Sequence, residues 1–470
     1  MLNLETILQK HREYEREADL DLIRRAYAFA DVAHLGQKRL NGEEELTHLL
    51  QTTDYLADYR ADSVTLAAAL LHDILELSDV DRAMLEKEFG EEVAALVDGM
   101  TVVRAASGRS EAGKGRNWEN LRHLILASIH DPRVLVIRIA DKIHNLRTSA
   151  ILAEEERRIS AQKVFDIWAP LAEILGLYRF KSEMEDLSFE ILHPQDFAKI
   201  KSEVRRESEK MERVVKLVSR KLSADLAAQK ISGSVTDRTK HLFGVYRKLP
   251  RYESRARGKM FDVLGLRVIT DTVENCYRIL DLARKNWKEV PEFFDDYIAR
   301  PKSNGYRSVH AVFEADGQLV EIQIRTREMH EAAEYGLAAH SIYKEKGDRH
   351  LAAGERIRMV ESLLDWGKGQ NLELFPEQVF VFTPKGDVKV LPKGATPVDF
   401  AFAVHTQIGR ECAGAKANGK AVSLNYPLRT GEVVEIMIAK GKKPSVDWLR
   451  FVKTEHARSE IEKATRSRVS

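Results

Sequence analysis

The sequence predicts a multidomain protein with an all-α first part, an α+β middle part built on a mixed sheet, and a small β-rich third part. Apolar residues recur at three- and four-residue steps from about Asp19 to Lys230, which is typical of packed helices. Short β-rich runs alternate with helical stretches after Ile231. Two hairpin patterns flank one helical pattern after Glu377. We therefore expect domains at 1–195, 196–370 and 376–440, and a helical tail at 441–470.

Bulk composition excludes several classes of protein. The 470 residues suffice for about three domains of ~150 residues, and 44% hydrophobic with 31% charged residues suits packed cores. A net charge of +1 argues against a general nucleic-acid or membrane-surface binder. Cys276 and Cys412 are far apart and lack metal-ligand spacing, which favours a reducing, cytoplasmic setting. We expect no signal peptide and no membrane contact, because no apolar run approaches the ~20 residues of a membrane span.

The first part is expected to be helical throughout. Asp62 is the expected N-cap of a helix over SVTLAAALLHDILEL, which places His72 and Asp73 on consecutive helical positions, about 100° apart. A long charged helix near residues 195–229 is expected to join the first two domains and to carry a conformational signal between them.

Strands are expected at 263–270, 309–315 and 319–326, with a helix at 276–287. The segment DRTKHLFGVYRK is expected to be helical, with Lys240, Gly244 and Lys248 on one stripe. In the third part, QVFVFTP and VKVLP form a hairpin, Thr396 begins a short helix, and the Asn418–Gly419 pair suits a two-residue hairpin turn. A further strand closes this part in GEVVEIMIAK.

A candidate metal site lies in the helical part. Four polar residues interrupt apolar helical runs: His48, His72, Asp73 and Asp141. Two histidines and two acids suit Mn, Fe or Zn with water at the open positions, and such a water becomes a nucleophile. The alternative is that each residue is a buried polar group satisfied by a hydrogen bond.

A candidate nucleotide site lies in the middle part. The segment DDYIARPKSNGYRSVH carries cations and an aromatic ring on a tight loop: Lys302, Asn304, Tyr306 and His310. On strand 319–326, Glu321, Gln323 and Arg325 share one polar face. Asp262 and Glu321, from separate strands, are suited to hold Mg²⁺ against phosphate oxygens, and Arg238, Lys240 and Lys248 add positive charge. The alternatives are a solvated turn and a solvated basic stripe.

The first part resembles the HD hydrolase domain of the RelA/SpoT homologue family in AHLGQKRLNGEEELTH, LLHDILE and ADKIHNLRT. The resemblance implies that His48, His72, Asp73 and Asp141 hold Mn²⁺, that Arg39 lies near substrate phosphates, and that the domain removes the 3′-pyrophosphate of guanosine tetra- or pentaphosphate, (p)ppGpp. Glu76 matches the first of two consecutive catalytic acids. Leu77 stands where the second is usual, and Leu49 replaces a usual proline, so we expect a slower hydrolase.

The middle part is similar to the synthetase domain of the same family in RTKHLFGVYRK, FDVLGLRVI, DYIARPKSNGYRSVH and VEIQIRTREMHEAAEYGLAAHSIYK. The family fold is nucleotidyltransferase-like, and the family transfers pyrophosphate from ATP to the 3′-hydroxyl of GDP or GTP. The resemblance implies ATP phosphates on Arg238, Lys240 and Lys248. It also implies Mg²⁺ on Asp262 and Glu321, with Glu321 activating the hydroxyl. Tyr306 would stack on guanine, beside Lys302, Asn304 and His310. Gly244 and Arg307 depart from a usual Ser and Gln.

The third part resembles the β-grasp TGS domain of long family members, in which a histidine matching His405 contacts RNA ends on ribosomes. Ribosome or tRNA contact is thus an expected partner interaction; the alternative for His405 is a structural helix cap. Long family members carry zinc-finger-like and ACT-like regulatory domains after this part, and the sequence ends too soon to contain them, so we expect a truncated chain or a naturally short member.

Three functions stay open at this point. The leading one is a (p)ppGpp synthetase of the stringent response with a slower Mn²⁺-dependent hydrolase. The second is mainly a (p)ppGpp hydrolase with a regulatory synthetase domain. The third is a non-catalytic, nucleotide-responsive ribosome-binding protein.

Overall fold

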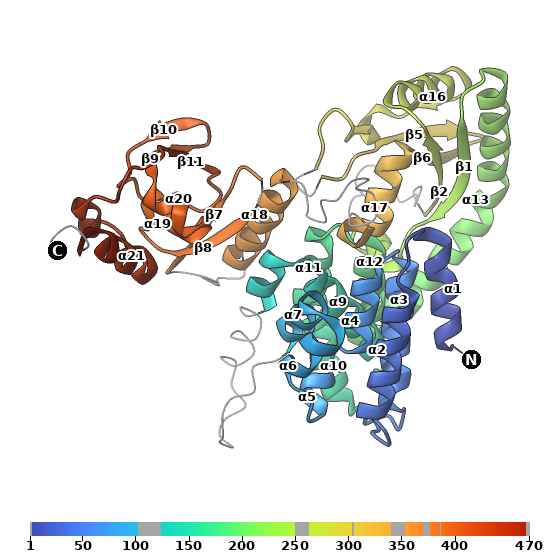
Figure 1. Cartoon of the computed structure of the whole chain (residues 1–470). Helices are drawn as coiled ribbons and strands as arrows, with labels where there is room; N and C mark the ends of the chain where they lie inside the picture. The colour runs from blue at the N-terminus through green and yellow to red at the C-terminus, as the bar shows by residue number, and fades with distance from the viewer. Residues whose placement is uncertain are drawn as a thin grey trace. The chain divides into compact units, whose positions relative to one another are not determined.

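The first part of the chain is helical, as its periodicity predicts (Figure 1). The computed structural model describes residues 2–101, 124–249, 263–302, 305–339, 353–369, 377–385 and 387–466. The chain divides into two compact units, 1–103 with 132–347 and 104–131 with 348–470. The helices of the first unit up to the sheet are α1 Leu4–Tyr14, α2 Leu20–Ala33, α3 Glu45–Asp58, α4 Ser63–Leu70, α5 Ile74–Leu77, α6 Arg82–Phe89, α7 Glu91–Met100, α9 Arg133–Arg147, α10 Glu154–Lys163, α11 Ala169–Ile174, α12 Tyr178–Leu192 and α13 Pro194–Ala228.

Helix α4 begins where predicted but ends earlier than expected. Asp62 accepts a hydrogen bond from the Thr65 amide at 2.7 Å and caps the helix. The prediction of one continuous helix through His72 and Asp73 is wrong, because residues 71–73 form a turn between α4 and α5. Nδ1 of His72 lies 2.8 Å from the Ala69 carbonyl oxygen. A side chain that takes a backbone carbonyl in this way competes with the helical hydrogen bond.

The middle part forms a six-stranded mixed sheet within the described residues. Its order is β1–β2–β6–β5–β3, with β4 paired to β5. Strands β2 and β6 run parallel and the other pairs antiparallel, which confirms the predicted mixed sheet. The elements are β1 Gly233–Thr239, α14 Leu242–Tyr246, β2 Leu264–Thr270, α16 Val273–Asn286, β3 Lys288–Glu289, β4 Asp295–Asp296, β5 Val309–Ala315, β6 Gln318–Thr326 and α17 Arg327–Ala339.

One face of this sheet is apolar and the other is polar. The apolar face packs against α13 and α16 in a core that includes Leu222, Ile279, Leu266, Ile322 and Ile324 (Figure 1). Alternation along β6 sends Glu321, Gln323 and Arg325 to the opposite face. These three side chains are buried there, so they do not form a solvated face.

The expectation of a helix over DRTKHLFGVYRK is wrong for its first half. Residues up to Thr239 form β1, and Arg238 pairs with Gly265 of β2. Helix α14 is limited to Leu242–Tyr246. Ladder hydrogen bonds to β2 outweigh the local helical pattern, since tertiary context routinely overrides propensity.

The second unit contains the two predicted hairpins and the helix between them. Its elements are α18 Ala353–Gly369, β7 Gln378–Phe382, β8 Val388–Pro392, α19 Pro397–Val404, α20 Thr406–Arg410, β9 Cys412–Ala417, β10 Lys420–Val422, β11 Val434–Ile438 and α21 Glu455–Arg466. Thr396 caps α19 through a reciprocal capping box with Asp399. Asn418 and Gly419 have φ of 49° and 78°, as the predicted two-residue turn requires. The small β-rich third domain is confirmed.

Within the described part of the chain, no helix combines the length and the apolar character needed to cross a bilayer.

Candidate functional site

Four side chains from three segments of the first unit converge in its helical part. His48 comes from α3, His72 and Asp73 from the turn after α4, and Asp141 from α9. Nε2 of His48 lies 3.3 Å from Nε2 of His72 and 3.4 Å from Oδ1 of Asp141. Oδ2 of Asp73 lies 3.2 Å from Nε2 of His72. One atom each from His48, His72 and Asp73 lies within 4.8 Å of the others, and Asp141 is 4.0 Å from His72. The predicted ligands therefore meet.

The chemistry of these four groups fits a divalent cation. A carbonyl oxygen only accepts, so Nδ1 of His72 carries a proton toward Ala69 and Nε2 faces the cluster. Burial lowers the pKa of His48 to about 4, which keeps this imidazole neutral. Burial also acts on His72, but Asp73 and Asp141 outweigh it and raise its pKa. Two buried imidazole nitrogens at 3.3 Å need a proton or a cation between them, and a cation bound by two carboxylates suits this donor set.

His144 orients one of these ligands. Its Nδ1 lies 2.7 Å from Nδ1 of His48, and both side chains are fully buried. Nε2 of His144 lies 3.8 Å from Oε2 of Glu43. A histidine whose distal nitrogen is held in this way presents its other nitrogen in a defined direction. The sequence interpretation missed His144, although it stands three residues after Asp141 on the same helical face.

Arg138 is the counter-ion of the acids around this cluster. It is 6% exposed and donates to Glu76 at 2.8 Å and to Asp73 at 3.3 Å, and its Nη1 lies 3.6 Å from Asp141. Burial acts to raise the pKa of Asp73. The opposite effect of His72 and Arg138 is larger and holds this pKa below its usual range. The sequence interpretation missed Arg138 too, which precedes Asp141 by one helical turn. Glu76 thus faces Arg138, while Leu77 is 45% exposed.

Arg39 is connected to the same cluster through one amide. It donates to Glu45 at 2.7 Å and to Oδ1 of Asn145 at 2.6 Å. Asn145 in turn donates to Oδ1 of Asp141 at 2.6 Å. The guanidinium expected near substrate phosphates therefore lies one side chain away from a candidate metal ligand.

Glu321 is the centre of a second cluster, on the polar face of the sheet. Its Oε2 accepts from Arg238 at 3.2 Å and from Gln323 at 3.1 Å, and its Oε1 lies 3.8 Å from Nδ1 of His310. Glu321 is 9% exposed. A Cβ at Gly265 would lie 2.7 Å from the Glu321 carbonyl oxygen, so only glycine lets β2 approach β6 at this point.

A group of rings lies beside this carboxylate. The Tyr306 hydroxyl lies 2.8 Å from Nε2 of His310, and burial lowers the pKa of His310 to about 4. Nζ of Lys302 lies 5.2 Å from the Tyr306 ring centre and 4.5 Å from that of Tyr297. A neutral histidine, an aromatic face and a cation next to a buried acid are suited to bind a base and a phosphate.

Arg325 has local partners that the sequence did not predict. It is 2% exposed, lies 2.8 Å from Nδ1 of His330 and donates to Glu334 at 3.1 Å. Glu334 also pairs with Arg267 at 2.9 Å. One acid of α17 therefore holds two arginines of the polar face.

Two of the predicted nucleotide-site residues, Asp262 and Asn304, lie outside the described residues, so the predicted meeting of Asp262 with Glu321 stays a prediction. Lys240 follows β1 directly and its amide donates to the Val263 carbonyl at 3.0 Å. Lys248 follows α14. These two lysines are thus on opposite ends of a short helix and not on one continuous helical stripe.

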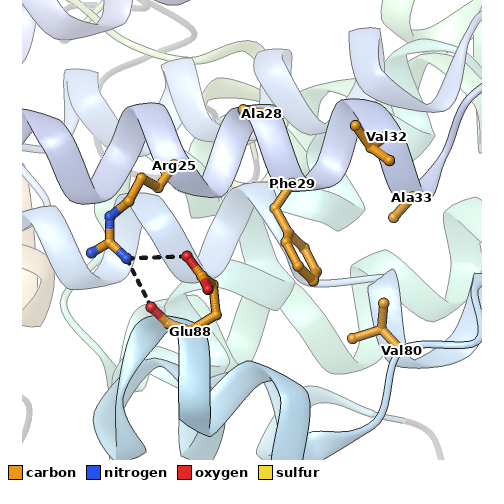
Figure 2. A pocket seen from close by; sticks show the side chains of 7 residues that line it. All are labelled: Arg25, Ala28, Phe29, Val32, Ala33, Val80 and Glu88. Carbon is orange, nitrogen blue, oxygen red and sulfur yellow. Dashed lines mark hydrogen bonds and ion pairs between the residues drawn. The ribbon is translucent and has the colours of Figure 1, made fainter.

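Two cavities in the described part of the chain contain none of the predicted site residues. One, of about 470 Å³, is lined by apolar side chains of α2 and by Val80, with Arg25 and Glu88 paired at its edge (Figure 2). The other, of about 310 Å³, is lined by residues of the helical part and of the α14 segment: Phe165, Pro170, Glu173, Lys181, Glu185, Phe243 and Arg247. The candidate binding residues therefore lie in the side-chain clusters described above and not in these cavities.

In the second unit, His405 is exposed and accepts a hydrogen bond from the Gln407 amide at 3.1 Å, as the N-cap of α20. The structural alternative considered for this histidine is thus present. Exposure leaves its other ring nitrogen available to a partner.

Comparisons with known proteins agree with this division of the chain. Family models match as an HD domain at 26–178, a region found in RelA/SpoT proteins at 237–348, and a TGS domain at 379–438. A guanosine-3′,5′-bis(diphosphate) 3′-pyrophosphohydrolase of Aquifex aeolicus is 41% identical over 98% of this chain and 66% of its own length. A GTP pyrophosphokinase of Myxococcus xanthus is 38% identical over 96% of this chain and 61% of its own.

The chain thus spans less than two thirds of the length of these curated relatives. Among solved structures, the small alarmone synthetase 1 from Bacillus subtilis matches 36% of this chain and 92% of its own at 25% identity, with a TM-score of 0.25. The assignment of this chain to a family rests on the sequence matches.

Proposed function

Because this chain belongs to the RelA/SpoT homologue family, we propose that it both makes and hydrolyses (p)ppGpp, with domains at 1–195, 196–370 and 376–440 and a tail at 441–470. In the synthetic direction it transfers pyrophosphate from ATP to the 3′-hydroxyl of GDP or GTP. In the opposite direction it removes that pyrophosphate. The name GTP pyrophosphokinase carried by relatives corresponds to the first activity.

The observation that carries the synthetic activity is the buried Glu321 carboxylate, which faces Arg238 and lies next to Tyr306 and His310. Glu321 accepts the proton of the 3′-hydroxyl as that oxygen attacks the β-phosphorus of ATP and AMP leaves. Arg238, Lys240 and Lys248 bind the triphosphate, and Gln323 orients Glu321. Phosphoryl-type transfer depends on such positioning and charge neutralisation. Asp262 and Glu321 would hold Mg²⁺, which would neutralise further charge on the phosphates.

The hydrolytic activity is assigned to the cluster of His48, His72, Asp73 and Asp141, which suits Mn²⁺. A bound Mn²⁺ supplies an activated water. Arg39 binds substrate phosphate, and Glu76, which Arg138 holds in place by a hydrogen bond, takes the proton of the attacking water. We propose that this activity is slow, because Leu77 provides no second acid.

Two further assignments complete the proposal. The TGS domain binds RNA of the ribosome or tRNA, with exposed His405 as a contact. The chain works in the cytoplasm, which its two free, buried cysteines support.

Incubation of the purified chain with ATP, GDP and Mg²⁺, and separately with ppGpp and Mn²⁺, tests the proposal. Formation of ppGpp in the first reaction and slow loss in the second are expected. The Glu321→Gln variant should lower only the rate of ppGpp formation, and Asp141→Asn only the rate of ppGpp loss. Loss without formation would select a hydrolase with a regulatory synthetase domain. Inertness in both reactions would select a non-catalytic ribosome-binding protein.

A further inference from the structure

Apart from its first residue, helix α12 lies outside both matched catalytic regions, and yet it contacts the basic segment of the synthetase. The matched regions end at 178 and begin again at 237, whereas α12 spans Tyr178–Leu192. Its Asp186 accepts from the Leu242 amide at 3.0 Å, through Oδ2, and from the Phe243 amide at 2.8 Å, through Oδ1. Both amides belong to the first turn of α14.

Helix α14 has no side-chain cap of its own. His241 occupies its N-cap position and makes no capping hydrogen bond there. The first amides of a helix have no partner inside the helix, and a capping oxygen normally satisfies them from the preceding residue. Here one carboxylate from a distant helix satisfies two of them, and its negative charge also suits the helix N-terminus.

A second contact of α12 explains a departure of this sequence from its family. The ring of His241 lies over Gly244, where a Cβ would be 2.4 Å from Nε2. Nε2 of His241 lies 3.5 Å from Oε2 of Glu185, the neighbour of Asp186 on α12. Because Gly244 leaves room for this ring, α12 holds α14 at two adjacent points.

Two lysines stand at the two ends of α14, so the contacts that hold this helix also affect where the lysines lie. Lys240 precedes α14 and is anchored to Val263 by its amide. Lys248 follows α14, and its amide donates to the Val245 carbonyl at 3.0 Å. The position of α14 therefore sets the distance and the direction of the two lysines relative to each other and to Arg238 on β1.

We propose that Asp186 is a positioning residue of the synthetase, which fixes α14 so that Lys240 and Lys248 bind the ATP triphosphate together. This inference rests on the proposed function for the ATP role of the lysines. The helix that follows the hydrolase region is then a structural part of the ATP site, although all but its first residue lies outside both matched regions. Asp186 itself touches no substrate.

The test compares Asp186→Ala and Asp186→Asn with Glu190→Ala, a variant of an exposed acid on the same helix. KM for ATP, KM for GDP and kcat are measured for each full-length protein, with Tm and Mn²⁺-dependent ppGpp hydrolysis as internal checks. We expect KM for ATP to rise about tenfold in Asp186→Ala and less in Asp186→Asn. A tenfold change corresponds to about 1.4 kcal/mol, which lies within the usual range for loss of a helix cap. KM for GDP and the rate of ppGpp hydrolysis should stay as in the parent protein. The Glu190→Ala variant should match the parent protein in every measurement.

A merely structural role would lower Tm and change both KM values together, or lower kcat alone, and either result would overturn the proposal. So would an unchanged KM for ATP in both variants. Should Asp186→Ala not fold, Asp186→Asn, which keeps one acceptor oxygen, decides. Direct ATP titration separates this inference from the proposed function. A chain that binds ATP but makes no ppGpp refutes the function alone, and the Kd for ATP then reports on Asp186. A chain that binds no ATP refutes both.

Discussion

Nδ1 of His48 lies 2.7 Å from Nδ1 of His144, and neither imidazole has any solvent exposure. Only one of these two nitrogens can carry the shared proton. If His48 offers Nε2 to a cation, its Nδ1 donates to His144, and His144 then carries its own proton on Nε2, 3.8 Å from Glu43. The direction of this short relay is thus determined by the metal-binding role of His48.

Replacing His144 should therefore weaken metal binding. We expect His144→Leu, which removes the acceptor, to lower Mn²⁺ affinity about 10- to 100-fold, the usual cost of losing a partner of a metal ligand. His144→Asn keeps an oxygen acceptor and should lose less. Isothermal titration of metal-free protein with Mn²⁺ measures both. Equal affinity of His144→Leu and the parent chain would contradict the relay.

The buried Arg138 should be essential for stability. Removing its charge in Arg138→Met takes one buried cation away from Asp73, Glu76 and Asp141, although Asp141 keeps Lys142 at 2.8 Å. Breaking a buried ion pair in this way costs about 3–5 kcal/mol. Urea unfolding measures the loss, and saturating Mn²⁺ should restore part of it. The matched control is Arg82→Met on α6, whose ion pairs are half-exposed and should contribute less than about 1 kcal/mol. A similar effect of both variants would refute this role of Arg138.

The missing acid at Leu77 should limit hydrolysis. Leu77 is 45% exposed, so Leu77→Asp adds a carboxylate without opening a core. General acid–base groups typically contribute about 10²–10⁴-fold, and we expect ppGpp hydrolysis to rise by at least about tenfold. Leu77→Asn introduces a side chain of the same shape as Asp but without a titratable group, so it should not gain activity. A flat response of Leu77→Asp in a steady-state assay would show that another step limits the rate.

Glu321 should be required for synthesis alone. Glu321→Gln replaces an oxygen that accepts from Arg238 and Gln323 by an amide, and synthesis should fall about 10²–10³-fold. The control is Glu314→Gln on neighbouring β5, where the side chain is exposed. Initial rates of ppGpp formation and of ppGpp hydrolysis are compared in each variant. Parallel loss of both rates in Glu321→Gln would place Glu321 in a structural role.

Stability should fall at acid pH through His11. Burial lowers the pKa of His11 to about 4, against ~6.5 in an unfolded chain, so the unfolded state binds the proton first as pH falls. The contribution of His11 to the free energy of unfolding is constant above pH 6.5 and declines by roughly 3 kcal/mol as the pH falls toward 4. The free energy of unfolding of the parent chain minus that of His11→Gln should shrink over this range. A difference that stays constant from pH 7 to pH 4.5 would contradict the assignment.

Local patterns predicted most elements because each depends on neighbours in the chain. Strand 309–315 forms as expected, Asp62 and Thr396 cap the expected helices, and Asn418 with Gly419 forms the expected turn. The two errors arose where a partner that the periodicity did not include decided the local structure: β2 is distant in sequence, whereas the Ala69 carbonyl is three residues from His72. β2 draws Arg238 into a strand, and the His72 side chain takes a carbonyl where α4 was expected to continue.

The sequence by itself determined the three kinds of domain and the identity of the candidate ligands, because side-chain periodicity and residue chemistry are properties of the chain alone. Only the tertiary structure decided that His144 supports His48, that Arg138 pairs with Asp73 and Glu76, and that Asp186 caps a helix 56 residues away. These contacts join segments far apart in sequence. Their existence depends on how packed helices and strands are placed in space, which no local pattern encodes.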